Sequence, residues 1–431
     1  MKRRDFMKMV AMLGVSAGMP MLSRPLYAAT PSPYTGTIFF NIHAHGGLDQ
    51  SSFADPREDP AINSWAKTAS TGGAGNIRYA PMPGNEAFFQ KYHQHMLVIN
   101  GVDSEVNNHS PGTRSRWSGR VAIGYPNIGE LIAGVLGQGL PMSYIYDGGY
   151  GDNVGVMPYT RLPDPTLLQE LSAPNRVSSN RDWMKQGDLD KVQLYKRARV
   201  EALKTTANLQ DLSRALSEMD SAYQGEDLLD RLAASMPTAI DTKDLTGADN
   251  KFVQKIHRAL IPAHAGLTSC INLQTTANFD SHENHDERHQ ALLPQLTAGI
   301  DYLWEKATEL GLANRLVVFM TSEFGRTPHY NAGLGKDHWP YGSAIFMKKG
   351  APWGDRVVGA SDEQHKALKI NPYTLQVDNS EQGIILKSKH VMQAYRMLAG
   401  IDLHPHATAY PLYAEEVDFF NPQQQTGYPT A

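Results

Sequence analysis

Acidic residues and histidines lie close together in the segment that contains Asp280, His282, His285 and His289. Carboxylates and neutral imidazoles are the ligands that zinc, manganese and iron prefer, and close spacing in one loop allows several of them to bind the same ion. The alternative is the exposed beginning of a helix, capped by Asp280 or Ser281. We expect His289 to lie on the face of that helix rather than on a metal ion. The segment therefore predicts either a metal site or a helix start.

Glu323 and Arg326 form a second group, directly after an apolar run that ends at Thr321. Glu323 could bind a metal ion, and Arg326 could hold an oxyanion or pair with Glu323. An ion pair within a turn is the simpler alternative. Asp337 and His338 follow a little later in the chain and offer another pair of metal ligands.

His109, Ser110 and Arg114 form a third group. At the start of a helix, the Ser110 hydroxyl could act as a nucleophile, with backbone N–H groups and Arg114 holding a tetrahedral anion. A serine followed by a proline is also a common helix start. We favour the helix start for Ser110 and a functional role for His109.

His43 and His45 form a fourth group, with Asp49 shortly after them. As alternate residues of a strand, both imidazoles would point to one face, where they could bind a metal ion or a substrate. A histidine at the end of a strand is more often a hydrogen-bonded turn residue.

Apolar runs predict the elements that position these four groups. We expect strands at residues 35–42, 96–100, 143–146, 268–275, 315–321 and 342–347, and helices at 181–224, 252–267, 287–310 and 388–398. Strands that alternate with helices favour an α/β fold with a mostly parallel central sheet flanked by helices. In such sheets ligand sites form beyond the carboxyl ends of the strands, which is where the four groups lie.

The composition excludes several classes of protein. The 431 residues, 41% of them hydrophobic, can bury a large core. A net charge of −4 is not the basic excess of a nucleic-acid-binding protein. Cys270 is the only cysteine, so no internal disulfide can form. Residues 30–431 are expected to form a single α/β domain with a helical insertion at about 160–250.

Residues 1–29 are typical of a cleavable export signal. Basic residues precede a charge-free run that is too short to span a bilayer, and the segment ends in alanines. Arg3 and Arg4 resemble the twin-arginine export motif. The pattern predicts export to the periplasm by the twin-arginine machinery, with no stable membrane span. An amphipathic N-terminal helix or an uncleaved anchor is the alternative.

Several of these segments together resemble an exported bacterial family called domain of unknown function 1501, which belongs to the alkaline phosphatase and sulfatase superfamily. The matching segments cover nearly the whole chain: the twin-arginine start and residues 45–49, 108–110, 279–282, 322–327, 337–338 and 358–362. The run Ser-Glu-Phe-Gly-Arg-Thr at 322–327 is the most specific of them. The resemblance implies an alkaline-phosphatase-like fold.

The resemblance also implies roles for single residues. Ser110 would be the nucleophile, and Arg114 stands four residues on, as in sulfatases. One metal site would be formed by Asp280, by His282 or His285, and by His338. The second would contain Asp49 and Glu323, but Phe324 stands where its histidine belongs. Since a benzyl group cannot bind a metal ion, the second site is expected to be weak, empty or built differently.

The leading interpretation is an exported hydrolase of phosphate or sulfate esters that uses one or two divalent ions, which could be zinc, manganese or calcium. The metal would polarise the ester and lower the pKa of Ser110 or of a water molecule, while Arg114 or Arg326 stabilises negative charge. The substrate would be a small-molecule or polymeric ester. The alternative is a non-catalytic periplasmic binding or assembly protein that keeps the fold with an incomplete site. Phe324 and the helical insertion favour this alternative.

Overall fold

The computed structural model describes residues 32–420, except 152, 163, 174, 179, 207–215, 217–230 and 242–249. The export signal predicted at 1–29 lies outside the described residues, and so does part of the helical insertion predicted at about 160–250. The export signal and the division into one domain with an insertion therefore stay predictions.

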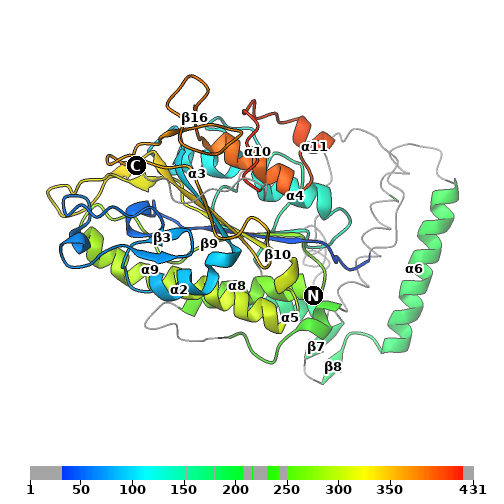
Figure 1. Ribbon diagram of the computed structural model, residues 1–431. Coiled ribbons are helices and arrows are strands. Elements are labelled where there is room, and N and C mark those ends of the chain that lie inside the picture. The colour runs from blue at the N-terminus through cyan, green and yellow to red at the C-terminus, as the bar shows by residue number, and fades with distance from the viewer. Residues whose placement is uncertain are drawn as a thin grey trace.

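An eight-stranded sheet forms the centre of the protein, in the order β14-β4-β13-β10-β1-β9-β5-β6 (Figure 1). Its strands are β1 (Ile38–His43), β4 (Met96–Asp103), β5 (Tyr144–Asp147), β6 (Thr160–Arg161), β9 (Cys270–Gln274), β10 (Leu316–Thr321), β13 (Tyr341–Lys348) and β14 (Arg356–Val358). Neighbouring strands are parallel except at β13, which is antiparallel to both β10 and β4. The predicted α/β fold with a mostly parallel sheet is confirmed.

Helices cover both faces of this sheet (Figure 1). One face carries α2 (Asn85–Tyr92), α8 (Asn250–His264) and α9 (His285–Glu309), and the other carries α3 (His109–Ser118), α4 (Ile128–Leu136) and α10 (Ser388–Leu398). Shorter or peripheral helices are α5 (Pro165–Ser172), α6 (Gln186–Thr206) and α11 (Pro405–Thr408). The described residues also form four two-stranded sheets: β2 (Gly72–Ala74) with β3 (Ile77–Tyr79), β7 (Arg176–Ser178) with β8 (Arg181–Asp182), β11 (Gly325–Arg326) with β12 (His338–Trp339), and β15 (Lys369–Ile370) with β16 (Ile384–Ile385).

Strand β1 shows why continuous apolar runs become strands here. All six of its residues are buried. Phe40 and Ile42 pack into one hydrophobic cluster, and Phe39 packs into another on the opposite face. Because helices cover both faces, most side chains on both faces are apolar, and the exceptions, Asn41 and His43, are buried with hydrogen-bond partners. Continuous apolar runs are therefore the right signal for these strands, whereas an alternating pattern would have missed them.

Helix α6 differs from its prediction. The sequence predicts a helix from residue 181, but Arg181–Asp182 forms strand β8 and pairs with β7, so the helix begins at Gln186. The part of the prediction at 207–215 and 217–224 lies outside the described residues. Figure 1 shows α6 standing apart from the sheet, and its Leu194 and Tyr195 are exposed. No helix within the described ranges is long and apolar enough to cross a membrane.

The strand register brings four loops to one edge of the sheet. His43 at the end of β1 pairs with Thr321 at the end of β10 and with Gln274 at the end of β9. Tyr341, the first residue of β13, pairs with Asp103 at the end of β4. The polar segments that follow these strands, and the one that precedes β13, therefore start from the same edge, as predicted for an α/β site.

Candidate metal centre

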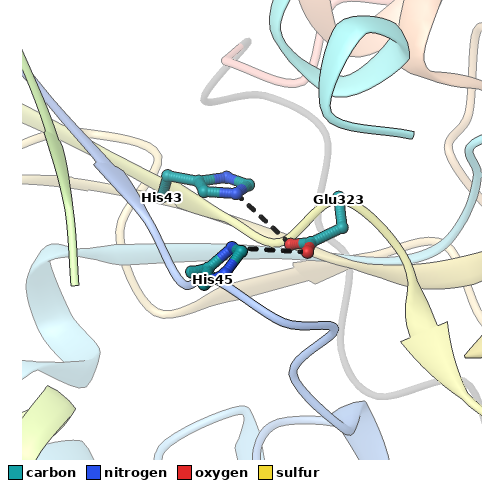
Figure 2. A group of neighbouring side chains, drawn as sticks. All are labelled: His43, His45 and Glu323. Atoms are coloured by element: carbon teal, nitrogen blue, oxygen red, sulfur yellow. Dashed lines mark ion pairs between the residues drawn. The ribbon is translucent and has the colours of Figure 1, made fainter. Parts of the chain in front are cut away.

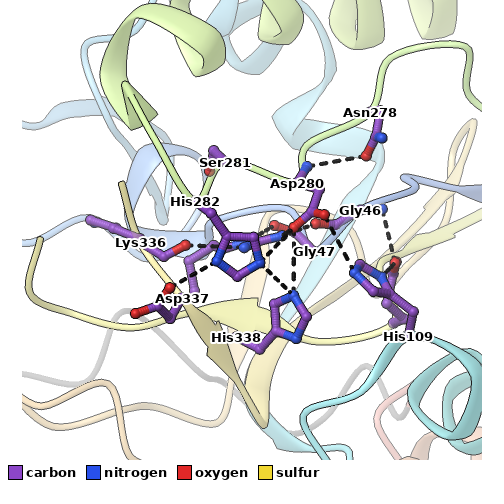
Figure 3. Close-up of polar contacts among 12 residues, drawn as sticks. Gly46, Gly47, His109, Asn278, Asp280, Ser281, His282, Lys336, Asp337 and His338 are labelled. Atoms are coloured by element: carbon purple, nitrogen blue, oxygen red, sulfur yellow. Dashed lines mark hydrogen bonds and ion pairs between the residues drawn. The ribbon is translucent and has the colours of Figure 1, made fainter. Parts of the chain in front are cut away.

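Asp280 lies at the centre of a cluster of histidines at this edge (Figure 3). Its Oδ1 is 3.2 Å from Nε2 of His282 and 3.5 Å from Nε2 of His338. Its Oδ2 is 3.6 Å from Nε2 of His109. The Nε2 atoms of His282 and His338 are 3.0 Å apart. We call Asp280, His109, His282 and His338 the ligand cluster.

Each imidazole of the ligand cluster has its other nitrogen, Nδ1, next to an oxygen. The partners are the Asn107 carbonyl for His338 (2.9 Å), the Asp337 carboxylate for His282 (2.8 Å) and the Glu323 carboxylate for His109 (2.8 Å). Carbonyl and ionised carboxylate oxygens only accept hydrogen bonds, so each Nδ1 carries the ring proton and donates it. In a neutral imidazole, Nε2 then presents a lone pair. All three lone pairs belong to atoms that face Asp280.

This arrangement fits a transition-metal ion. Lone pairs of Nε2 and carboxylate oxygens repel one another unless a proton or a metal ion lies between them. Two nitrogen ligands of a tetrahedral zinc ion, with bonds of about 2.0–2.1 Å, lie roughly 3.3 Å apart, and the distances of 3.0–3.6 Å in the ligand cluster match that spacing. Histidine ligands typically donate their second N–H to a carboxylate or carbonyl, as all three do here. The side chains of His282 and His109 are 45% and 37% exposed, so the cluster is open to solvent.

A second group consists of His43, His45 and Glu323 (Figure 2). Glu323 Oε2 is 3.3 Å from His43 Nε2, and Oε1 is 3.7 Å from His45 Nδ1. Its chemistry differs from that of the ligand cluster, because Trp117 donates its indole N–H to Nδ1 of His43 at 2.9 Å. An indole N–H can only donate, so His43 must carry its proton on Nε2, which faces Glu323. The Nε2–H of His43 therefore faces Glu323, and Nε2 has no lone pair available to a metal ion.

Glu323 is a completely buried carboxylate that receives several hydrogen bonds. The backbone N–H of Gly46 donates to Oε1 at 2.9 Å, beside the bond from His109. Burial alone would raise the pKa of Glu323, but His43 and the hydrogen bond from His109 outweigh it and lower the pKa to about 2. Burial lowers the pKa of His43 to about 4, so this ring is neutral at pH 7. The hydrogen bond to Glu323 raises the pKa of His109.

Through these hydrogen bonds Glu323 accepts from His109 and so fixes the orientation of that ring. A direct role of Glu323 as a metal ligand stays a prediction. Phe324, which replaces the histidine of the second site that the resemblance implied, packs against His109 and His338 with ring centroids 4.9 and 4.3 Å away. It therefore supports two rings of the ligand cluster instead of forming a second metal site with Glu323.

Arg326 is buried and pairs with Asp280, not with Glu323. Its Nη2 donates to Asp280 Oδ1 at 2.6 Å, and other N–H groups donate to the carbonyls of Gly46, Gly47 and Lys336. Burial alone would raise the pKa of Asp280, but Arg326 outweighs it and lowers the pKa. Because the guanidinium is fully buried, it orients Asp280 from behind. Contact with a substrate oxyanion, one of the predicted roles, would require it to become accessible.

Asp49 and His285, both predicted as metal ligands, contact each other, and Asp49 also contacts Lys336. Asp49 Oδ2 is 2.8 Å from Nε2 of His285 and 2.8 Å from Nζ of Lys336, and all three side chains are fully buried. Burial alone would raise the pKa of Asp49, but Lys336 and His285 hold it well below its usual value. His289 lies one turn further along α9, stacked on His285 and buried, which agrees with its expected place on the helix. The helix N-cap is Asn284, not Asp280 or Ser281.

In the predicted nucleophile group, helix α3 directs Arg114 away from His109 and Ser110. His109 and Ser110 open the helix, and Ser110 is exposed beside the ligand cluster's His109. The helix start predicted for Ser110 is present, although the N-cap residue is Asn108. Arg114 donates to the carbonyl of Val121, beyond the other end of the helix. Within the described residues, Arg114 has no contact with the ligand cluster.

Glycines allow the loops to approach one another closely. Gly46 has φ +100°, and a Cβ there would lie 2.6 Å from the backbone nitrogen of Asp280. At Gly335 a Cβ would lie 1.9 Å from the carbonyl carbon and oxygen of His282. Only residues without a side chain fit these two positions. The loop after β1 and the loop before β13 can therefore both pack directly against the segment that carries Asp280 and His282.

Sequence reasoning missed two residues of the site. Trp117 fixes the proton of His43, but a single tryptophan at the end of a polar segment carries no signal of a site. Lys336 precedes Asp337 and His338, and nothing in the sequence distinguishes it from an exposed lysine. The glycines shortly before it indicate a pliable loop and carry no signal of burial.

Comparison with solved structures finds similarity at low identity. Similar chains include Ps i-CgsB in complex with k-i-k-neocarrahexaose (10% identity, TM-score 0.43, covering 90% of this chain and 76% of that chain). PsFucS1 sulfatase from Pseudoalteromonas sp. has 10% identity and a TM-score of 0.40 over 91% of this chain and 74% of that chain. The phosphonate monoester hydrolase SpPMH from Silicibacter pomeroyi has 11% identity and a TM-score of 0.37 over 87% and 76%. At these values the similarity says nothing about the reaction.

Family membership rests on the sequence. No curated protein matches the chain. Residues 41–379 match a family described as "Protein of unknown function (DUF1501)". The match begins within β1 and includes all four residues of the ligand cluster and Asp49. The protein therefore belongs to the DUF1501 family.

Proposed function

We propose that the protein is an exported, metal-dependent hydrolase of phosphate or sulfate esters, with its metal centre at the ligand cluster. One observation supports this most strongly: three imidazoles each donate Nδ1–H to an oxygen and turn Nε2 toward Asp280. The resemblance implies a metal site that contains Asp280, His282 and His338, and these three side chains lie close together.

The donor set favours zinc, manganese or iron over calcium. Calcium is bound by six to eight oxygen ligands, whereas the ligand cluster offers three imidazole nitrogens and one carboxylate. We propose a single ion here, because Nε2 of His43 carries a proton and so offers no lone pair to a second ion beside Glu323. A bound ion would act as a Lewis acid that polarises the ester and favours deprotonation of the attacking hydroxyl.

The residues of the chain would supply the remaining parts. Ser110 is exposed next to His109 and is the proposed nucleophile. Asn108 makes no side-chain capping bond at the start of α3, so backbone N–H groups of the first turn can stabilise negative charge on the substrate. Glu323 holds His109, and Arg326 holds Asp280, in fixed orientations. The substrate would be a small-molecule or polymeric ester that reaches the protein in the periplasm after twin-arginine export.

A non-catalytic binding or assembly role is the second candidate. Helix α6 favours it, because this helix stands apart from the sheet with Leu194 68% and Tyr195 74% exposed (Figure 1). Such a helix could hold a partner. The two candidates differ in whether the ligand cluster is needed for turnover.

The test is metal content followed by turnover. The mature protein, purified from the periplasm, is analysed by inductively coupled plasma mass spectrometry and assayed with a panel of aryl phosphates and sulfates. We expect close to one transition-metal ion per chain and activity that His338→Ala abolishes. His264→Ala, a surface histidine outside the site, is the control. A metal-free protein that stays inactive after addition of zinc, manganese, iron and calcium would refute the enzyme proposal. A metalloprotein whose biological role survives His338→Ala would favour the binding role.

A further inference from the structure

A completely buried ion pair lies directly behind the ligand cluster. Lys336 Nζ is 2.8 Å from Asp49 Oδ2, and both side chains are 0% exposed. Lys336 also donates to Ser51 Oγ at 3.0 Å, and the backbone N–H and hydroxyl of Ser51 donate to Asp49 at 2.8 Å. We call Asp49, Lys336, His285 and Ser281 the Asp49 network.

The Asp49 network continues to the loop that carries Asp280. His285 Nε2 is 2.8 Å from Asp49, and its Nδ1 is 2.7 Å from the hydroxyl of Ser281. Asp49 accepts, so His285 carries its proton on Nε2, and Nδ1 accepts from the Ser281 hydroxyl. The carbonyl of Ser281 in turn accepts from the backbone N–H of Lys336 at 2.9 Å. The network is therefore a closed ring of contacts.

Two members of this ring are neighbours of the ligand cluster in the chain. Ser281 lies between Asp280 and His282, and Lys336 is two residues before His338. Figure 3 shows Ser281 and Lys336 beside the side chains of the ligand cluster. The ring thus ties together three loops: the one after β1, which carries Asp49, the one before α9, and the one before β12.

A buried ion pair needs a reason other than stability. Taking both charges out of water costs about as much as their attraction returns, and apolar replacements of similar volume are often equally stable. Fixed geometry is what an ion pair with saturated hydrogen bonds provides and an apolar pair does not. The loops that this ring joins include the ones that must hold Asp280, His282 and His338 at ligand distance.

We propose that the Asp49–Lys336 pair, acting through His285 and Ser281, positions the ligand cluster for its metal ion. Asp49, Lys336, His285 and Ser281 are positioning residues in this scheme and do not bind the ion. The proposal rests on the metal centre of the proposed function. It assigns Asp49 and His285 a different role from that of metal ligands.

The experiment measures zinc affinity by competition with a chelating dye, using the mature protein stripped of metal. The variant is the double substitution Asp49→Asn with Lys336→Met, which removes both charges together so that none is left buried alone. We expect folding to be retained and zinc affinity to fall 10- to 100-fold, the range found for partners that orient metal ligands. The absorption spectrum of the cobalt-loaded protein should keep its intensity, because the number of ligands is unchanged.

Two further variants make every outcome informative. Ser281→Ala removes only the hydrogen bond to His285, should retain the fold, and should lower zinc affinity in the same direction even if the double variant does not fold. Asp55→Asn with Arg57→Met, which removes both charges of a separate buried pair, is the matched control and should leave zinc affinity unchanged.

The possible failures are distinguishable. If wild-type protein binds no zinc, or binds it with an affinity that His282→Ala does not change, the proposed metal centre is wrong. If wild-type protein binds zinc at the ligand cluster and both the double variant, where folded, and Ser281→Ala keep wild-type affinity, only the positioning role is refuted. Loss of a cobalt ligand in Asp49→Asn with Lys336→Met would show Asp49 to be a ligand and would also overturn the positioning role.

Discussion

Replacing Glu323 by glutamine tests the hydrogen-bond assignments of the site most directly. Oε1 accepts from Gly46 and His109, and Oε2 accepts from the Ser322 hydroxyl at 3.0 Å and faces the Nε2 proton of His43 at 3.3 Å. The new amide has only one oxygen. If that oxygen keeps the bonds from Gly46 and His109, the amide NH2 must face the Nε2–H of His43. His43 cannot move its proton to Nδ1, because Trp117 already donates there.

The magnitude follows from these contacts. A buried donor left without an acceptor costs about 1–3 kcal/mol, and the bond from His109 loses its charged acceptor. We expect Glu323→Gln to lower the free energy of unfolding by about 2–4 kcal/mol. With His109 less firmly held, metal affinity should fall 10- to 100-fold. Urea unfolding and chelator competition measure the two effects separately.

Trp117→Phe provides the matched second variant. Without the indole N–H, His43 can place its proton on Nδ1 and accept from the new amide at residue 323 through Nε2. The double variant should therefore be less destabilised than the sum of the two single variants, by about 1 kcal/mol. Additive losses would refute the proton assignment of His43. Complete loss of metal binding in Glu323→Gln, with a changed cobalt spectrum, would show that Glu323 is itself a ligand.

Three further predictions concern other parts of the structure. His282→Ala removes one nitrogen of the ligand cluster and should lower zinc affinity more than 100-fold, measured by chelator competition, whereas His264→Ala should not change it. Gly335→Ala places a Cβ 1.9 Å from the backbone of His282 and should lower both the melting temperature and zinc affinity. Gly187→Ala in α6, where nothing lies within 4 Å, should leave both unchanged or raise the melting temperature slightly. Burial raises the pKa of Glu130 from 4.5 to about 7, so the folded protein holds this proton more tightly than the unfolded chain. Stability should therefore fall by roughly 3 kcal/mol as the pH rises from 4.5 to 7, and Glu130→Gln should reduce this slope in urea unfolding at pH 5 and pH 7.5.

The sheet could be predicted because burial on both faces leaves a strong signal. Residues 38–43 and 316–321 are mainly apolar runs, the first interrupted by Asn41, that lead into polar turns, and the predicted strands there match the structure within a few residues. Helix α10 begins and ends at the predicted residues, because its apolar spacing is regular. The direction of β13 could not be predicted, since an antiparallel strand buried on both faces has the same apolar sequence as a parallel one.

The sequence could predict where the site lies but not the contacts of its individual residues. Polar residues after the strand ends indicated where Asp280, His282 and His338 would meet. They could not indicate that His282 faces Asp280 whereas His285, three residues further on, faces Asp49. This difference depends on Lys336, which is buried beside Asp49. Its burial results from tertiary packing and leaves no pattern in the local sequence. The proton positions of the imidazoles depend on partners far away in sequence, such as Trp117 for His43.

The antiparallel course of β13 has a consequence for how members of this family can diverge. Because β13 enters the sheet at the edge where β10 leaves it, the chain between Thr321 and Tyr341 makes an out-and-back excursion and never crosses the sheet. The pairing of β11 with β12 closes the neck of this excursion, with Arg326 opposite His338. Gly335, Lys336 and Asp337 are anchored by their contacts, but the exposed residues 332–334 at the tip can be exchanged without a change in strand register. Related proteins would therefore differ at this exposed tip while the anchored residues at its base stay in place.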